Sequence, residues 1–380
     1  MRDLFILATA ITCVALPGCS KNDKQSAEKK APEPAATKPA DPGAATAQKK
    51  PEPAAKQVKA IPDGYHTVTP MLTVKSIEDA IGFYSKVFAA KTLLSMPGPD
   101  GKLVHAEIQI GDSHIMIGAE MSGQSKSPDT LKGTTGSLLV YVEDVDAVTK
   151  SAIEAGAKEL MKVDDQFWGD RWGMIIDPFG HAWGIATHKI EVPPEKMGEL
   201  AKAWNPDAKK KPEIPGTPAK HWQPERMHTV VPSIHIAGGA APLGFYEKAL
   251  GAKVSGTTLM PDGKTLMHAE LELGDSIVMV SGENPAMGSK SPKTLGGTPL
   301  ALFVYTEDVD AAFARATAQS AEVKEAVDDQ FWGDRFGSVY DPSRHEWGLA
   351  THKEDVSPAE MARRMKAMMG QAPDKASGGE

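Results

Sequence analysis

Short apolar stretches alternate with amphipathic ones along residues 61–200. Strict alternation over 103–110 predicts a strand with one buried face, whose apolar positions are Val104, Ala106, Ile108 and Ile110. Apolar residues three and four positions apart predict a helix over 77–88, with Ser76 as its N-cap. Other strands are predicted at 68–74, 114–118, 137–142, 158–163, 172–176 and 181–187, and a second helix at 145–155. This order indicates a βαβββ unit that occurs twice.

The whole pattern returns in the second half of the chain at an offset of 162 to 164 residues. His66-Thr67-Val68 recurs as His228-Thr229-Val230, and 18 of 26 positions are identical between 164–189 and 328–353. A period this long excludes a solenoid. It predicts two homologous domains, 61–200 and 226–369, joined by a linker at 201–225 and followed by a disordered tail at 370–380.

The chain before the first copy has a different composition. An apolar run over residues 4–16 is too short to span a bilayer permanently and is typical of a signal peptide, predicted at 1–18. Leu16-Pro17-Gly18-Cys19 resembles the lipobox of bacterial lipoproteins, so we expect a lipid on Cys19 that binds the protein to a membrane. With Ser20 rather than Asp after the cysteine, the sequence resembles the sorting pattern for the outer membrane facing the periplasm, and an ordinary secretory signal is the alternative. Residues 19–60, rich in Ala, Lys and Pro, are predicted to be a disordered tether.

Composition excludes several function classes. Both cysteines, Cys13 and Cys19, precede the predicted domains, which excludes a disulfide framework or a cysteine nucleophile there. The formal net charge of −8 argues against nucleic acid as a partner, because phosphate binding needs a basic surface.

One turn and its flanking motifs carry a family resemblance. Asp177-Pro178-Phe179-Gly180, the motif at 165–171 and Trp183-Gly184 are similar to the vicinal oxygen chelate superfamily, which includes glyoxalases, bleomycin-resistance proteins and extradiol dioxygenases. The motifs resemble its glyoxalase-like, PhnB-type branch in particular. The resemblance implies an α+β fold of tandem domains, in which two βαβββ modules form a curved sheet around each cleft. The second copy departs at Ser343-Arg344, so its turn must close without glycine.

Glyoxalase-type members of this family hold a divalent metal with four His, Gln or Glu side chains. In the first copy the resemblance places these positions near Thr69, on Met116 or Ile117, on Ser137 and on Gly184. In the second copy it places them near Val231, on Met279 or Val280, on Ala301 and on Gly348. None of these side chains is a suitable ligand, so we expect no metal site and predict no cofactor.

Polar and aromatic residues on the predicted cleft faces are the remaining candidates. The pairs His105 with Glu107 and His268 with Glu270 are candidates for acid–base chemistry or ligand binding, and a solvent-facing or structural role is equally open. The candidate ligand-binding residues are Tyr141, Trp168, Arg171, Tyr305, Trp332 and Arg335. Tryptophan and arginine could form an aromatic wall and a cationic clamp. The alternative is an Asp–Arg pair that braces a loop while the aromatic rings pack in the core.

Two functions follow from these residues. The favoured one is a metal-free module in the cell envelope that binds a small hydrophobic or aromatic molecule. The alternative is a lyase or isomerase of the glyoxalase-like type that acts on a small carbonyl compound through His105 and Glu107. A structural role, or binding of another envelope protein, stays open. Because one chain carries four modules, we expect them to pair within the chain and the protein to be a monomer.

Overall fold

The computed structural model describes residues 58–121, 125–204, 208, 211–260, 262–285 and 288–370. The predicted signal peptide, Cys19, most of the predicted tether and the tail at 371–380 lie outside the described residues. All described residues belong to one compact unit. None of the helices in the described ranges is long and apolar enough to cross a membrane.

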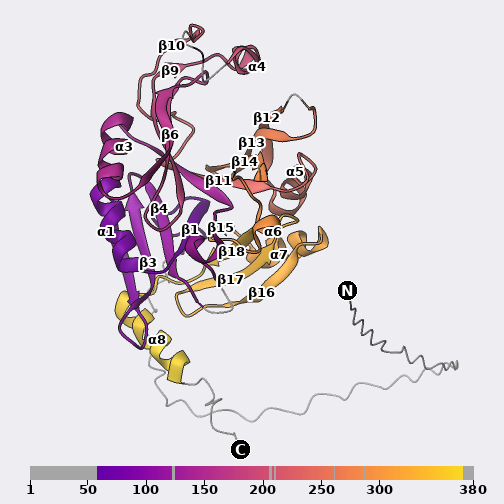
Figure 1. The fold of residues 1–380 in the computed structure, drawn as a ribbon. Coiled ribbons are helices and arrows are strands. Elements are labelled where there is room, and N and C mark those ends of the chain that lie inside the picture. The colour runs from indigo at the N-terminus through magenta and orange to yellow at the C-terminus, as the bar shows by residue number, and fades with distance from the viewer. Residues whose placement is uncertain are drawn as a thin grey trace, which may run out of the picture. The chain divides into compact units, whose positions relative to one another are not determined.

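Two eight-stranded mixed sheets form the centre of this unit (Figure 1). The order across the first sheet is β16 (Glu322–Asp329), β17 (Asp334–Tyr340), β18 (Glu346–His352), β15 (Leu300–Tyr305), β1 (Val68–Val74), β4 (Ser113–Ala119), β3 (Leu103–Ile110) and β2 (Lys91–Pro97). The order across the second sheet is β12 (Lys253–Leu259), β13 (Leu266–Leu273), β14 (Ser276–Gly282), β11 (Val230–Ile236), β5 (Gly136–Tyr141), β8 (Ala182–His188), β7 (Asp170–Ile176) and β6 (Lys158–Asp165). The predicted α+β fold is confirmed.

Each sheet joins one module from each sequence copy. The first sheet forms where β1 pairs antiparallel with β15, with Met71 opposite Ala301. The second forms where β11 pairs antiparallel with β5, with Ser233 opposite Ser137. Two modules therefore share each sheet, as the resemblance implies, but the partners lie far apart in the sequence. The two repeats and the two sheets do not coincide.

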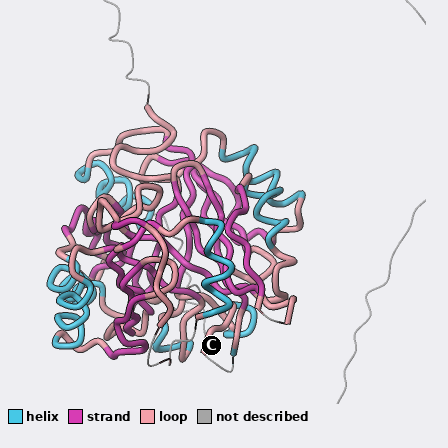
Figure 2. Tube along the Cα trace, turned by 90° about the horizontal axis from the view of Figure 1, so that it is seen from above, coloured by secondary structure: helices cyan, strands magenta, loops and turns pink. Residues whose placement is uncertain are grey.

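The helices lie mostly at the periphery in Figure 2, and those over residues 77–88, 145–154 and 309–318 pack against strands of the two sheets. The longer ones are α1 (Ile77–Phe88), α3 (Val145–Glu154), α4 (Pro194–Ala203), α7 (Val309–Ala318) and α8 (Pro358–Gly370). The shorter ones are α2 (Pro128–Leu131), α5 (Leu243–Phe245), the π-helix η1 (Tyr246–Leu250) and α6 (Pro292–Leu295), and a small ribbon joins β9 (Ile190–Glu191) to β10 (Thr217–Pro218).

Helix α1 shows how the local sequence forms these elements. Its limits are those predicted, and the Ser76 side chain caps it by accepting a hydrogen bond from the Asp79 N–H. Its apolar face packs on β3 and β4 and contributes Ile77 and Tyr84 to a core shared by all four modules. Strand β2 was not predicted, because most of its side chains are exposed and carry no alternating pattern.

The two copies interlock through the turns between β3 and β4 and between β13 and β14. The Asp112 carboxylate accepts a hydrogen bond from the Thr229 N–H at 2.8 Å, and Ser113 Oγ accepts one from the Val230 N–H at 2.9 Å. Gly111 precedes them with a φ of +57°, where an added Cβ would lie 2.3 Å from Thr229 Oγ1. The equivalent turn at Gly274 packs against Thr67 in the same way, so the contact occurs twice.

Candidate ligand-binding site

We call the face of each sheet that points away from its helices the inner face. Along the first sheet, the strand register aligns Glu107, Met116, Met71 and Ala301 in one row. The side chains that alternate with Met71 along β1, such as Leu72, point to the opposite face and lie in the core. The alternation predicted for residues 103–110 is confirmed, since Ala106 and Ile108 are fully buried on the other side.

Because the modules are exchanged, each sheet combines metal-ligand positions of the family from both sequence copies. The first sheet brings together Thr69, Met116, Ala301 and Gly348, and the second brings together Val231, Met279, Ser137 and Gly184. None of these eight residues offers an imidazole, a carboxylate or a thiolate. The side chains at these eight positions therefore do not fit the family's metal.

His105 and Glu107 lie together on the inner face of the first sheet. His105 Nε2 lies 3.4 Å from Glu107 Oε1, and the Tyr65 hydroxyl donates a hydrogen bond to the other carboxylate oxygen. Burial alone would raise the pKa of Glu107, but the hydrogen bonds from His105 and Tyr65 outweigh it and lower the pKa. Tyr65 packs edge-on against His114 and Tyr305, and thus covers the pair. Sequence reasoning missed Tyr65.

The equivalent pair on the second sheet is held differently. Arg226 donates two hydrogen bonds of 2.6 Å to the Glu270 carboxylate, and His268 Nε2 lies 3.6 Å from Glu270 Oε1. Burial opposes the shift, but His268 and Arg226 lower the pKa of Glu270 to about 2. Met227 replaces Tyr65 and lies in an apolar cluster that fills this inner face, with Leu139, Tyr141, Ala186, Val231 and Ile277.

Tyr141 and Trp168 converge on a buried carboxylate. Asp170 accepts hydrogen bonds from the Tyr141 hydroxyl at 3.2 Å and from Trp168 Nε1 at 3.1 Å, and His188 Nδ1 lies 2.7 Å away. The second copy repeats the network around Asp334, with Tyr305, Trp332 and His352 at 3.1, 3.0 and 2.7 Å. The polar atoms of these predicted ligand-binding residues are thus engaged within the protein.

Arg171 and Arg335 do not reach the inner faces. Arg171 donates two hydrogen bonds, of 2.6 and 2.7 Å, to the Asp146 carboxylate on α3, and a longer one to Asp165. Arg335 binds Asp310 and Asp329 in the same way. Both guanidinium groups join a helix to a strand, whereas the bracing alternative had an Asp–Arg pair that holds a loop. The predicted cationic clamp is absent at these two positions.

A cavity of about 610 Å³ opens at one end of the first sheet's inner face. Met71, Thr73 and Ala301 form part of its wall. Its other lining residues include Lys126, Lys293, Lys324, Tyr340, Arg344 and Glu346. This volume is typical of a small-molecule site. None of the residues predicted to bind a ligand lines it, although the departure at Ser343-Arg344 was a signal for its location.

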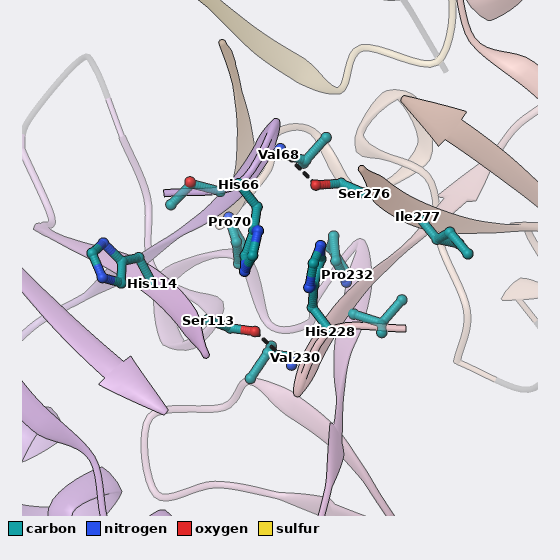
Figure 3. A pocket seen from close by; sticks show the side chains of 12 residues that line it. His66, Val68, Pro70, Ser113, His114, His228, Val230, Pro232, Ser276 and Ile277 are labelled. Carbon is teal, nitrogen blue, oxygen red and sulfur yellow. Dashed lines mark hydrogen bonds between the residues drawn. The ribbon is translucent and has the colours of Figure 1, made fainter. Parts of the chain in front are cut away.

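Two histidines stack where the copies meet, as Figure 3 shows. The His66 and His228 ring centroids are 3.4 Å apart, beside a cavity of about 10 Å³. Their Nδ1 atoms lie 2.8 Å from Asp275 and 3.2 Å from Asp112, and their Nε2 atoms donate to the backbone carbonyls of the opposite aspartates.

Within the described ranges, this cluster contains the one group of three metal-ligand side chains, His66, Asp112 and His228, whose donor atoms all lie within 4.8 Å. Stacked rings direct their lone pairs along parallel planes, so the two imidazoles do not converge on one ion. The geometry fits an ion-pair network that joins the copies.

Comparison with known proteins now places the chain in a family. The model of the Glyoxalase/Bleomycin resistance protein/Dioxygenase superfamily matches residues 65–185 and 239–349. The chain belongs to this superfamily, and its two glyoxalase-like regions confirm the tandem arrangement predicted from the repeat.

The chain is also similar to individual proteins. Uncharacterised proteins of Mycobacterium bovis and Mycobacterium tuberculosis are each 40% identical over 129 residues, which is 33% of this chain and 85% and 76% of theirs. The crystal structure of glyoxalase I from Zea mays is similar with a TM-score of 0.50 and 14% sequence identity, over 79% of this chain and 94% of that one. At that identity the likeness shows the fold alone.

Proposed function

We propose that this protein is a metal-free binding module for a small molecule, which it holds in the cavity of the first sheet. One observation carries the proposal: a cavity of about 610 Å³ adjoins an inner face whose central positions offer no metal ligands. The wall combines apolar atoms of Met71 and Ala301 with an aromatic ring, Tyr340, and a few charged groups. That combination is typical of pockets that bind organic ligands.

The enzyme alternative rests on His105 and Glu107. Both side chains are mostly buried, with 25% and 15% exposure, and Tyr65 covers them. Neither residue lines the cavity. A substrate would have to displace Tyr65 to reach the carboxylate, so we favour binding over catalysis. The combined variant Glu107→Gln and Glu270→Gln tests the choice, because an enzyme of this kind would lose its turnover of small dicarbonyl compounds.

Thermal unfolding with and without added compounds, in the wild type and in a variant whose cavity is filled by a tryptophan side chain, tests the binding function. A panel of neutral and charged aromatic compounds is added to chelator-treated protein, and thermal unfolding is measured. A ligand at 100 times its Kd should stabilise the protein by about 2.7 kcal/mol. Ala301→Trp should abolish the stabilisation, whereas Ser137→Trp, the same change at the equivalent position of the second sheet, should retain it. The proposal fails if no compound stabilises the wild type, or if both variants lose binding equally.

We further propose that the protein acts in the cell envelope, bound to the outer membrane through a lipid on Cys19, and that it belongs to the PhnB-type branch. The sequence at Leu16-Pro17-Gly18-Cys19 supports the anchor, and the motif at 165–171 supports the branch. Labelling with a radioactive fatty acid tests the anchor: label should enter the wild type and be absent from Cys19→Ala. Label retained in that variant would contradict it.

A further inference from the structure

The cavity of the first sheet differs from the equivalent region of the second sheet at several lining positions. At five lining positions a charged or aromatic residue of the first sheet replaces an unrelated one of the second. The pairs are Lys293 and Asp129, Lys324 and Leu160, Tyr340 and Ile176, Arg344 and Gly180, and Glu346 and Ala182. Both sheets have the same topology, so the fold itself does not require these differences.

The backbone of Arg344 has the left-handed conformation that its glycine counterpart adopts more readily. Arg344 adopts a φ of +72°, whereas its counterpart in the first copy is Gly180 with a φ of +89°. Glycine adopts this left-handed conformation without strain, but an arginine does not. The turn closes on Asp341 in the same way as the first copy's turn closes on Asp177. The turn itself therefore does not require an arginine at position 344, because glycine forms the same turn in the first copy.

The guanidinium group of Arg344 is held in place and yet retains free donors. It lies over the Tyr340 ring, 4.2 Å from its centroid, and Nη1 donates to Glu322. Within the described part of the chain, Glu322 is its one hydrogen-bond partner through the side chain. Since arginine carries five N–H donors, several remain available to a ligand.

The charges around the cavity are unbalanced. Four cationic side chains and one carboxylate line it, and a second carboxylate, Glu322, pairs with Arg344, in a protein whose net charge is −8. Lys324 is paired with the lining carboxylate, Glu346, at 2.6 Å. Lys126 and Lys293 form no ion pair with any described residue. An anionic group is the ligand chemistry that such a wall attracts.

We propose that the cavity recognises an anion: a small molecule with an apolar or aromatic body and one carboxylate, sulfonate or phosphate group. The anionic head binds Arg344 and Lys293, and the body lies against Tyr340, Met71 and Ala301. This inference rests on the proposed binding function and narrows it to a chemical class. It also restricts that function to the first sheet, since the second has Gly180 and Asp129 at the positions of the two cations.

Two fluorescent probes of similar shape test the inference: anilinonaphthalene sulfonate, which is anionic, and N-phenylnaphthylamine, which is neutral. Each is titrated into the whole protein. Arg344→Gly and Lys293→Asp install the residues of the other copy, and Arg344→Gly relieves the backbone strain, so that variant should fold. Each should weaken binding of the sulfonate about tenfold and leave the neutral probe unchanged. Lys290→Asp, the change at the second-sheet equivalent of Lys126, is the control and should leave both probes unchanged.

The outcomes separate the two proposals. If both probes bind equally and the two variants change neither, the anion preference is overturned and the binding function stands. If Lys290→Asp weakens the sulfonate as much as Arg344→Gly does, the anion site is not in this cavity. If neither probe binds the wild type, both proposals fail.

Discussion

Gly111→Ala tests the interlock between the two copies. Gly111 has a φ of +57°, and a Cβ there would lie 2.3 Å from Thr229 Oγ1 and 2.7 Å from Thr229 Cβ. Thr229 is 5% exposed and its hydroxyl donates to Gln223, so the side chain has little room to move. The substitution therefore combines backbone strain with a steric overlap between residues that are 118 positions apart.

The backbone strain and the steric overlap each reduce the free energy of unfolding by an amount that can be estimated. A left-handed conformation costs an L-residue about 1–2 kcal/mol, and overpacking costs about 1–3 kcal/mol. Replacing glycine by alanine regains about 0.4–1 kcal/mol by restricting the unfolded chain. The expected loss in free energy of unfolding is about 2–4 kcal/mol. Gly101→Ala is the matched control, because Gly101 has a φ of +83° but no described atom within 4 Å of the added Cβ. It should cost about 1 kcal/mol.

Equilibrium unfolding in urea, followed by tryptophan fluorescence, measures these changes. Thr229→Ala removes two of the three contacted atoms, so the double variant should be less destabilised than the sum of the single variants by about 1 kcal/mol. Separate sheets for the two copies would leave residues 111 and 229 without contact. The reasoning is refuted if the two changes add within about 0.5 kcal/mol, or if Gly111→Ala costs no more than Gly101→Ala.

Three further predictions concern pH, the cover of the first sheet and metal. The hydrogen bond to Asp112 raises the pKa of His228 despite burial, so its contribution to stability is complete below the unfolded pKa of about 6.5 and declines as the pH rises above that value. The free energy of unfolding should fall less steeply there in His228→Gln, and equal slopes would contradict this. Tyr65→Phe should raise the pKa of Glu107, measured by NMR, and cost about 1.5–3 kcal/mol; an unchanged pKa would show that Tyr65 does not stabilise the carboxylate. Dialysis against a chelator should leave the unfolding midpoint unchanged, and a stoichiometric metal in elemental analysis would count against a metal-free module.

Most elements could be predicted because burial on one face produces a period in the sequence. Strand β3 alternates from Val104 to Ile110, and α1 has the predicted limits. Strand β2 has no such period because it lies at a sheet edge with most side chains exposed. The local sequence does not show that the modules exchange. The two central strands have similar sequences, Leu138-Leu139-Val140-Tyr141 and Leu302-Phe303-Val304-Tyr305, so either could pair with β1 or with β11. Distant contacts such as Gly111 with Thr229 fix the choice.

For the site residues, too, the sequence predicted what depends on local periodicity and missed what depends on contacts between distant residues. The strand period placed His105 and Glu107 on one face, but nothing local to them indicates that Tyr65 covers them. Arg171 could have been assigned better, because Asp170 and Arg171 are consecutive on β7 and consecutive residues point to opposite faces. The break at Ser343-Arg344 was visible in the sequence, whereas the cavity beside it depends on strands from both copies.

Because the modules are exchanged, each inner face combines residues from both copies, and the two inner faces differ. The first sheet takes Tyr65 from the first copy and Lys324, Tyr340 and Arg344 from the second, and it has the basic cavity. In the second sheet, Met227 and its apolar neighbours fill the inner face, and Arg226 neutralises Glu270. A substitution in one copy therefore alters one sheet without disturbing its equivalent in the other. Because the differences gather around a single cavity, we expect one ligand to bind per chain, and calorimetric titration should give a stoichiometry of one.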